Sequence, residues 1–213
     1  MTEIPIILRL KKQRQKDLAS AQDILVKETF SVFENAVLHG GTAIWRCYNG
    51  NRFSEDVDVY IPKDEKRLQE LFTRFERAGF KIEKKKIRDI SIFSSLILNR
   101  TAVRFEALFK KITGVPKEYE KCNGAFITIR TLTPEHIIKE KVQAYQKRLR
   151  VRDMYDIFFL LRHVKDKNNV KKDINEFINN FKNPIDETNL KEIVLEYIIH
   201  SVTEMLNYIR GAV

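Results

Sequence analysis

The sequence predicts an α+β protein: a mixed sheet flanked by helices, followed by a bundle of helices. Between residues 56 and 132, several short runs alternate apolar and polar residues, which is typical of strands. Before this region and again from Pro134 to the end, apolar residues recur at helical spacing. We therefore expect an α/β core with an N-terminal helix over residues 1–132, and a helical domain over residues 133–213.

The elements of the first part follow from residue spacing and from glycine and proline positions. Residues 15–36 have the spacing of a helix, and a short helix is expected to begin near Thr42, directly after Gly40-Gly41. The run DVDVYI alternates as a strand should and ends at a proline. An amphipathic helix over residues 63–80 is closed by Gly79. Further strand-like runs follow, namely FKIEKKKI, SIFSSLIL, AVRFEALF and AFITIRTL.

The second part begins at Pro134, which suits the first turn of a helix. Its last predicted helix, LKEIVLEYIIHSVTEMLNYI, carries apolar residues at helical spacing. These residues are Ile193, Val194, Tyr197, Ile198, Val202, Met205 and Ile209. We expect this face to cover the helical core, with contact to a second copy or to a partner protein as the alternative.

Composition indicates a globular chain with a basic surface. Of 213 residues, 43% are apolar and 32% are charged, and no apolar stretch is long enough to cross a membrane, so we expect an intracellular soluble protein. Two cysteines do not form a disulfide framework or a zinc motif. The net charge is +10, with clusters such as KIEKKKIRD, KRLRVR and KDKNNVKK. These clusters favour a polyanionic partner, and a solvated lysine-rich surface is the alternative for any one of them.

Two aspartates, Asp56 and Asp58, are separated by one residue on a predicted strand. Side chains two apart point to the same face, so the carboxylates project together while Val57 and Val59 face the core. Adjacent carboxylates repel each other, and a divalent cation relieves this repulsion. The pair therefore predicts a site for Mg²⁺ or Mn²⁺ that also contacts substrate phosphates.

The glycine turn before this strand predicts a phosphate site. Gly40 and Gly41 have no side chain to prevent close approach, and the helix near Thr42 offers unpaired backbone N–H groups to an anion. Arg52 and Ser54 precede the aspartates and are candidates for further phosphate contacts. A nucleoside triphosphate with its metal ions on the aspartates would satisfy both features.

The segment GGTAIWRCYNGNRFSEDVDV resembles the signature of the DNA polymerase β-like nucleotidyltransferase superfamily. With the later EKVQAYQKRLRVRDMYDIFFLL, it is more similar to the AbiEii/AbiGii-type nucleotidyltransferases, which are toxins of type IV toxin–antitoxin and abortive-infection systems. The resemblance extends over residues 38–161. It implies a polymerase β-like core, transfer of a nucleoside monophosphate from an NTP, an RNA acceptor such as the 3′ end of tRNA, a cognate antitoxin and a cytoplasmic location.

The resemblance also implies roles for individual residues. Gly41 and Thr42 match the phosphate-binding turn, and Asp56 and Asp58 match the metal ligands. Lys141 matches a lysine that reaches the nucleotide phosphates.

Within RDMYDI, Asp153 and Asp156 are both candidates for a further acidic residue of the site, because they lie three apart and share a helix face. The structural alternative is that Asp153 caps a helix beginning near Val151 or pairs with Arg152.

Members of the superfamily usually carry a third carboxylate on a neighbouring strand, and Glu106 is placed to be that group. A charge pair between Glu106 and Arg104 on an edge strand is the alternative. Two other functions also remain open at this point: transfer of a different group to a protein or small molecule, and RNA binding without catalysis.

Overall fold

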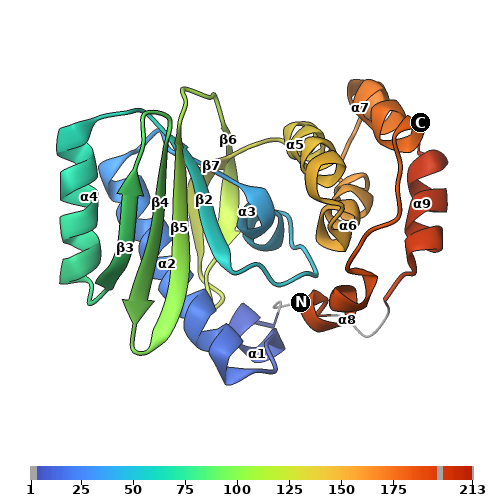
Figure 1. Ribbon diagram of the computed structural model, residues 1–213. Helices are drawn as coiled ribbons and strands as arrows, with labels where there is room; N and C mark the ends of the chain where they lie inside the picture. The colour runs from blue at the N-terminus through green and yellow to red at the C-terminus, as the bar shows by residue number, and fades with distance from the viewer. Residues whose placement is uncertain (1–3, 196–198, 213) are drawn as a thin grey trace. The chain divides into compact units, whose positions relative to one another are not determined.

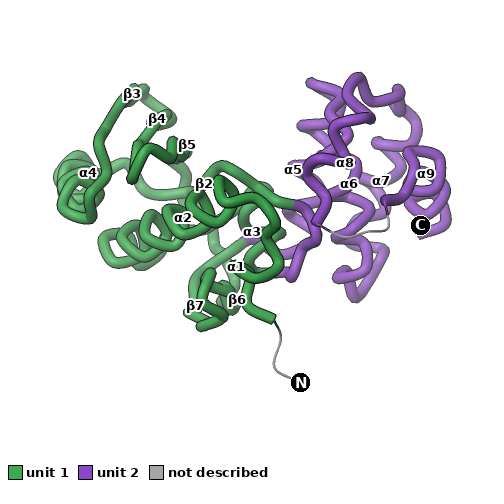
Figure 2. The backbone as a smooth tube through the Cα atoms, turned by 90° about the horizontal axis from the view of Figure 1, so that it is seen from below, with its two compact units in different colours: residues 1–47, 53–131 green, residues 48–52, 132–213 purple. Residues whose placement is uncertain are grey.

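The computed structural model of the chain describes residues 4–195 and 199–212 (Figure 1). It divides into two compact units, residues 1–47 with 53–131 and residues 48–52 with 132–213 (Figure 2). The short segment 48–52 thus joins the second unit, although the expected boundary lay near residue 132. Its backbone pairs with the C-terminal region: Arg52 and Val194 form an antiparallel bridge, and the Leu195 N–H donates to the Asn51 carbonyl at 2.8 Å.

The first unit is built on a seven-stranded mixed sheet of the order β3-β4-β5-β2-β1-β7-β6. The strands are β1 (Val37–His39), β2 (Asp56–Ile61), β3 (Lys81–Ile87), β4 (Ser91–Leu98), β5 (Thr101–Phe109), β6 (Val115–Glu120) and β7 (Phe126–Thr131). β2 runs parallel to β5, β1 runs parallel to β7, and the other neighbours are antiparallel. The predicted α+β class is therefore confirmed.

Four helices accompany this sheet: α1 (Ile6–Arg9), α2 (Gln13–Val32), α3 (Gly40–Cys47) and α4 (Glu65–Arg77). α2 and α4 cover one face of the sheet, where the alternate residues of β2 and β5 are apolar (Figure 1). Val57 and Val59 are buried on this face, as predicted, and Phe75 of α4 meets Phe105 of β5 edge-on with ring centroids 5.3 Å apart. The opposite face of β2 and β5 carries the polar residues.

The strand-like runs of the sequence correspond to β3, β4, β5 and β7, whereas β6 was not predicted. β6 is the edge strand of the sheet beyond β7, and most of its residues are exposed. Its sequence VPKEYE contains a proline and three charged residues, which an edge strand tolerates because one side of its backbone needs no partner. No alternation of apolar residues therefore marks it in the sequence.

The second unit is helical, with α5 (Pro134–Arg148), α6 (Val151–Leu160), α7 (Asn168–Asn179), η1 (Glu187–Asn189), α8 (Leu190–Ile193) and α9 (Val202–Arg210). Pro134 opens α5, as predicted, and the Thr133 side chain accepts a hydrogen bond from the His136 N–H as its N-cap. Leu149 ends α5 in the left-handed conformation. None of the described helices is long and apolar enough to span a membrane.

The single terminal helix expected over residues 190–209 is wrong, because two separate helices occupy this region. α8 ends at Ile193, and α9 begins after Ser201, whose side chain and backbone form a capping box with Glu204. Val202, Met205 and Ile209 are buried against the helical core as expected. The residues Tyr197 and Ile198 of the predicted apolar face lie outside the described residues.

Candidate functional site

The glycine turn and the second aspartate of the DxD pair are in contact. Gly40 opens α3 directly after β1 with φ +71°, a conformation that L-residues rarely adopt. A Cβ on Gly40 would lie 3.2 Å from Cγ and 3.3 Å from Cβ of Asp58, and nearer still to its carboxylate oxygen Oδ2. Only glycine therefore allows the chain to turn here while Asp58 points toward the start of α3.

Thr42 holds the beginning of α3 against the beginning of β2. Its hydroxyl donates a hydrogen bond to the backbone carbonyl of Asp56, and the residue is buried. The hydroxyl thus serves as an anchor, and the predicted phosphate contacts of Gly41 and Thr42 would be made through backbone N–H groups of the first helical turn. These contacts remain predictions.

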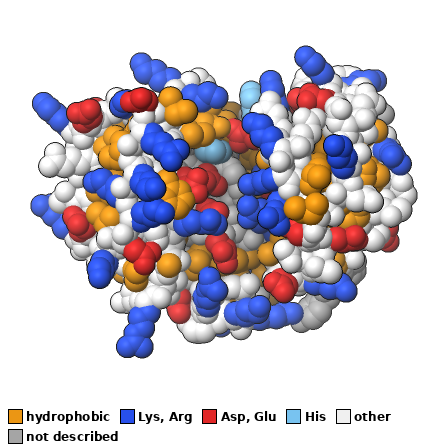
Figure 3. Space-filling model, in the orientation of Figure 1, with side chains coloured by type: hydrophobic (Ala, Val, Ile, Leu, Met, Phe, Trp, Pro, Cys, Tyr) orange, Lys and Arg blue, Asp and Glu red, His pale blue; other side chains and the backbone are white. Residues whose placement is uncertain are grey.

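Asp58 and Glu106 lie opposite each other on the neighbouring parallel strands β2 and β5, and Asp56 lies opposite Arg104. Arg104 Nε and Nη2 donate to the two carboxylate oxygens of Asp56 at 2.6 and 2.8 Å. The expected alternative, a pair between Arg104 and Glu106 on an edge strand, is wrong because β5 lies inside the sheet and Arg104 turns to Asp56. Figure 3 shows acidic side chains gathered over the first unit with lysines and arginines beside them.

This arrangement of carboxylates affects the protonation of Glu106. Burial, together with the charges of Asp58 and Asp56, raises the pKa of the half-buried Glu106 carboxyl. A divalent cation would relieve the same repulsion, and carboxylate oxygens on adjacent strands are the donors that such an ion prefers. The donor chemistry therefore fits a metal ion, although no three acidic, cysteine or histidine side chains of the described residues are arranged as a ready-made cage.

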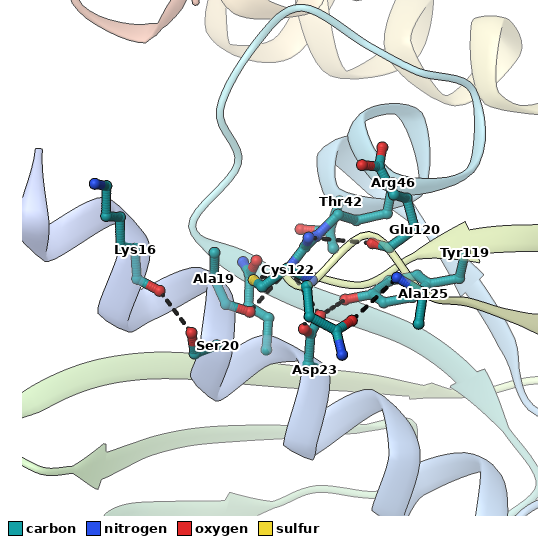
Figure 4. Close-up of polar contacts among 12 residues, drawn as sticks. Lys16, Ala19, Ser20, Asp23, Thr42, Arg46, Tyr119, Glu120, Cys122 and Ala125 are labelled. Carbon is teal, nitrogen blue, oxygen red and sulfur yellow. Dashed lines mark hydrogen bonds and ion pairs between the residues drawn. The ribbon is translucent and has the colours of Figure 1, made fainter. Parts of the chain in front are cut away.

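α3 is fixed at its other end by a buried arginine (Figure 4). Arg46 Nη2 donates to the Ala19 carbonyl at 2.8 Å and to Asp23 Oδ1 at 2.9 Å, and its Nη1 donates to the Glu120 carbonyl at 3.2 Å. Its guanidinium also lies 5.2 Å from the centroid of the Tyr119 ring. Arg46 thereby connects α3 to α2 and to the end of β6, so the helix that presents the glycine turn is held at both ends.

The two aromatic residues that follow the turn, Trp45 and Tyr48, pack in the interior. Trp45 is buried edge-on against Phe53, with centroids 4.8 Å apart. Tyr48 is also buried, and its hydroxyl donates to the Leu132 carbonyl at 2.6 Å. Neither described side chain is therefore exposed for stacking on a base.

Ser54 and Arg52 were predicted to contact phosphates, and in the structure both contact other protein groups. Ser54 is buried in the first unit, and its carbonyl accepts a hydrogen bond from the Gln22 side chain at 2.8 Å. Arg52 belongs to the second unit, where its Nε and Nη2 donate to the two oxygens of Asp156, each at 2.8 Å. Their phosphate contacts remain predictions.

Lys141 and the two candidate aspartates form one buried cluster in the second unit. Lys141 Nζ lies 2.7 Å from Asp156 Oδ2 and 3.5 Å from Asp153 Oδ1, which confirms that the aspartates share a helix face. Although burial acts in the opposite direction, the charges of Arg52 and Lys141 hold the pKa of Asp156 below its usual value. The carboxylates thus hold Lys141 within a network of ion pairs.

Arg148 completes this cluster and was not predicted. Its Nε and Nη2 each donate to a carboxylate oxygen of Asp153 at 2.7 Å. Asp153 therefore pairs with Arg148 and not with Arg152, and the carboxylate that accepts from the first N–H of α6, that of Val151, is Asp186 at 2.7 Å, so both structural alternatives proposed for Asp153 are wrong. Among the described residues, the cluster brings together three cations and two carboxylates.

A cavity of about 480 Å³ opens on the polar face of the first unit. Its lining includes Asp58 and Glu106 together with His39, whose ring stacks on Tyr60 at 4.0 Å. The lining also includes basic residues of β3 and its following turn, which lie within the KIEKKKIRD cluster. His39 was not predicted from the sequence as a site residue, and its position directly before Gly40 is the signal that could have indicated it.

A scan of protein-family models matches residues 23–201 to a family described as "Nucleotidyl transferase AbiEii toxin, Type IV TA system". No curated protein sequence matches the chain. Among solved structures, the fold is similar to MenT4, a nucleotidyltransferase toxin from Mycobacterium tuberculosis, with 17% identity, a TM-score of 0.64, and coverage of 93% of this chain and 82% of that one. It is also similar to JHP933 from Helicobacter pylori, with 19% identity, a TM-score of 0.65, and coverage of 95% and 91%.

Proposed function

We propose that this chain, which belongs to the AbiEii family of nucleotidyltransferase toxins of type IV toxin–antitoxin systems, transfers a nucleoside monophosphate from an NTP to the 3′ end of an RNA. The observation that carries the proposal is the contact between the Gly40 turn and Asp58, with Glu106 opposite Asp58 on the next strand. A glycine turn at the start of a helix and a pair of carboxylates thus meet in one unit. Phosphoryl transfer requires this combination: a site that binds the phosphates, beside groups that stabilise the charge that develops during the reaction.

In the proposed reaction, the 3′ hydroxyl of the acceptor attacks the α-phosphorus of the NTP. A new phosphodiester bond forms, the bond between the α-phosphorus and the bridging oxygen breaks, and pyrophosphate leaves with the electron pair. The hydroxyl proton passes to a carboxylate of the site, and Glu106, which lies opposite Asp58 on the neighbouring strand, is the candidate. Backbone N–H groups at the start of α3 would orient the triphosphate.

Asp56, Asp58 and Glu106 are the residues that would hold Mg²⁺ or Mn²⁺. When bound, such an ion neutralises charge on the phosphates and on the attacking oxygen. Asp56 would then share its carboxylate between the ion and Arg104, which already occupies both oxygens in the structure.

The family resemblance assigns Lys141 to the nucleotide phosphates, and we retain this assignment as part of the proposal. Its support within the second unit is the buried cluster in which Asp153 and Asp156 hold Lys141 Nζ. The two aspartates would then be positioning residues.

The proposed RNA acceptor rests on the charge of the chain, and the proposed antitoxin partner rests on the family. An RNA acceptor, with the 3′ end of tRNA as the specific candidate, is supported by the net charge of +10. A cytoplasmic location follows from such an acceptor. An antitoxin as binding partner and an NTP as substrate follow from membership of the family.

The test is incubation of the purified protein with each α-labelled NTP in turn, total RNA and Mg²⁺ or Mn²⁺, with EDTA as the metal-free control. We expect label in RNA, concentrated in the tRNA fraction, and its loss with EDTA and in Asp58→Asn. Asp89→Asn is the matched control because this aspartate is fully exposed. Parallel reactions with γ-labelled NTP and with total protein test the alternatives. Label from the γ-position, label in protein only, or RNA binding without any transfer would each overturn the proposal.

A further inference from the structure

The β-sheet register places one row of polar and aromatic side chains across five adjacent strands of the first unit. Lys86 of β3 pairs with Phe93 of β4, Phe93 pairs with Glu106 of β5, Glu106 pairs with Asp58 of β2, and Asp58 pairs with His39 of β1. Residues directly opposite each other in neighbouring strands point to the same face. All five line the cavity described above.

Lys84 and Arg88 extend the row on the β3 side. Both line the cavity with Lys86, and all three residues are exposed. Lys84 Nζ lies 5.4 Å from the centroid of the Phe93 ring. Among the described residues, none of the three cations is within ion-pair distance of a carboxylate, in contrast to Arg104 and Lys141. We name Lys84, Lys86 and Arg88 the basic wall.

The sheet order separates the basic wall from the phosphate-binding turn. The turn follows β1, which lies on one side of β2, whereas β5, β4 and β3 lie on the other. Three inter-strand spacings of 4.8 Å place the Lys86 backbone about 14 Å from that of Asp58. A triphosphate on the Gly40 turn would therefore be bound on the side of Asp58 away from the basic wall.

Building on the proposed function, we propose that the basic wall and Phe93 bind the single-stranded end of the acceptor RNA, with the wall contacting the phosphates next to its 3′ nucleotide. Alternate residues on a strand are about 6.7 Å apart, which is comparable to the separation of successive phosphates in an extended RNA strand. An aromatic ring beside cations, as Phe93 is beside Lys84 and Lys86, is the arrangement that binds single-stranded nucleic acid through base stacking and phosphate contacts. The acceptor hydroxyl would then lie toward Glu106.

The same strand provides a charge-matched control. Lys85 Nζ lies 4.3 Å from the Phe72 ring of α4, on the opposite face of the sheet from the cavity. Lys81 is exposed and does not line the cavity. The double variant Lys81→Gln/Lys85→Gln therefore removes the same charge from β3 as Lys84→Gln/Lys86→Gln, without changing the basic wall.

The experiment measures binding of a short fluorescent single-stranded RNA with a free 3′ hydroxyl, over a series of salt concentrations, without NTP. We expect Lys84→Gln/Lys86→Gln to weaken binding about tenfold and to reduce the salt slope by about 1.4, which is 0.7 for each of two phosphate contacts. Phe93→Leu should weaken binding with an unchanged slope, because it removes stacking and no charge. The Lys81/Lys85 control should bind like the parent.

Transfer kinetics then show whether the basic wall contacts the phosphates of the RNA or those of the NTP. In the RNA-labelling reaction, we expect Lys84→Gln/Lys86→Gln to raise KM for RNA and to leave KM for NTP unchanged. A raised KM for NTP with unchanged RNA binding would assign the wall to the triphosphate and overturn the proposal. Equal losses in both double variants would also overturn it, since the effect would then be one of general surface charge.

The binding assay also separates this proposal from the proposed function. If no variant and no condition gives transfer, but RNA binding falls only in the basic-wall variant, the proposed reaction fails and the RNA site stands. If transfer to RNA is found and its KM for RNA does not depend on the basic wall, the reaction stands and the RNA site fails.

Discussion

The backbone of Gly40 lies against the side chain of Asp58, so closely that a Cβ at position 40 would collide with the Asp58 carboxylate. The two residues come from different motifs, a glycine turn and a strand, that are separated along the chain. Their contact makes the turn and the carboxylate one structural unit. A change at either residue should therefore affect both the conformation of the turn and the chemistry of the acid.

Substitution Gly40→Ala tests this coupling. The added Cβ meets the Asp58 carboxylate, and an alanine at φ +71° is strained, so we expect a loss of about 1–3 kcal/mol in the free energy of unfolding. Transfer should fall because Asp58 must move away from the turn. Urea denaturation and the RNA-labelling assay measure the two effects. Gly211→Ala is the control, since φ is −78° there and the nearest atom to its Cβ would be 3.5 Å away; parental activity in Gly40→Ala would contradict the role of the contact.

The two aspartates of the pair should differ in their effect on stability. We expect both Asp56→Asn and Asp58→Asn to reduce transfer to below about a hundredth of the parental rate. Asp58→Asn should retain or raise the free energy of unfolding, because repulsion with Glu106 is relieved. Asp56→Asn should lower it by up to about 1 kcal/mol, because the partly exposed Arg104 pair is lost. Urea denaturation of both variants checks the sign, and a stability loss confined to Asp58→Asn would contradict the prediction.

The raised pKa of Glu106 predicts a specific pH dependence of stability. A carboxyl with a raised pKa in the folded state binds its proton more tightly there, so its contribution to stability is present at low pH and is lost as pH rises through the folded-state pKa. Glu106→Gln should therefore be more stable than the parent at neutral pH. Unfolding curves recorded from acidic to neutral pH measure the difference in the free energy of unfolding between Glu106→Gln and the parent. This difference should become smaller at pH values below the ordinary pKa of glutamate. A difference that is independent of pH would show that the cause is not titration of Glu106.

The ion-pair cluster of the second unit should depend strongly on Asp156. Asp156→Asn leaves Arg52 and Lys141 buried without their shared carboxylate, and we expect a loss of about 3–5 kcal/mol in the free energy of unfolding. Urea denaturation measures it, with the exposed Glu192→Gln as a matched control in the same unit. If Asp156→Asn instead keeps its stability and loses transfer, Asp156 acts on the reaction directly and not by holding Lys141.

The sequence determined the local features of this protein, because they depend on residues close together in the chain. Alternation predicted β3, β4, β5 and β7, and Pro134 predicted the start of α5. The pairing of a glycine turn with Asp56 and Asp58 indicated the family, which the family model then matched. The sequence did not predict the edge strand β6 or the break before α9. β6 has no alternation of apolar residues, and the helical spacing of apolar residues continues through the break.

Only the tertiary structure decided which charged groups are partners. Arg104, Arg148 and Arg52 neutralise Asp56, Asp153 and Asp156, and each pairing depends on strand register or helix packing between residues that the sequence leaves equally available. The same register placed Lys86 and Glu106 in one row, where the sequence showed merely a lysine cluster and a separate acid. Coulomb interactions decay with distance in space, and distance in space is set by the fold.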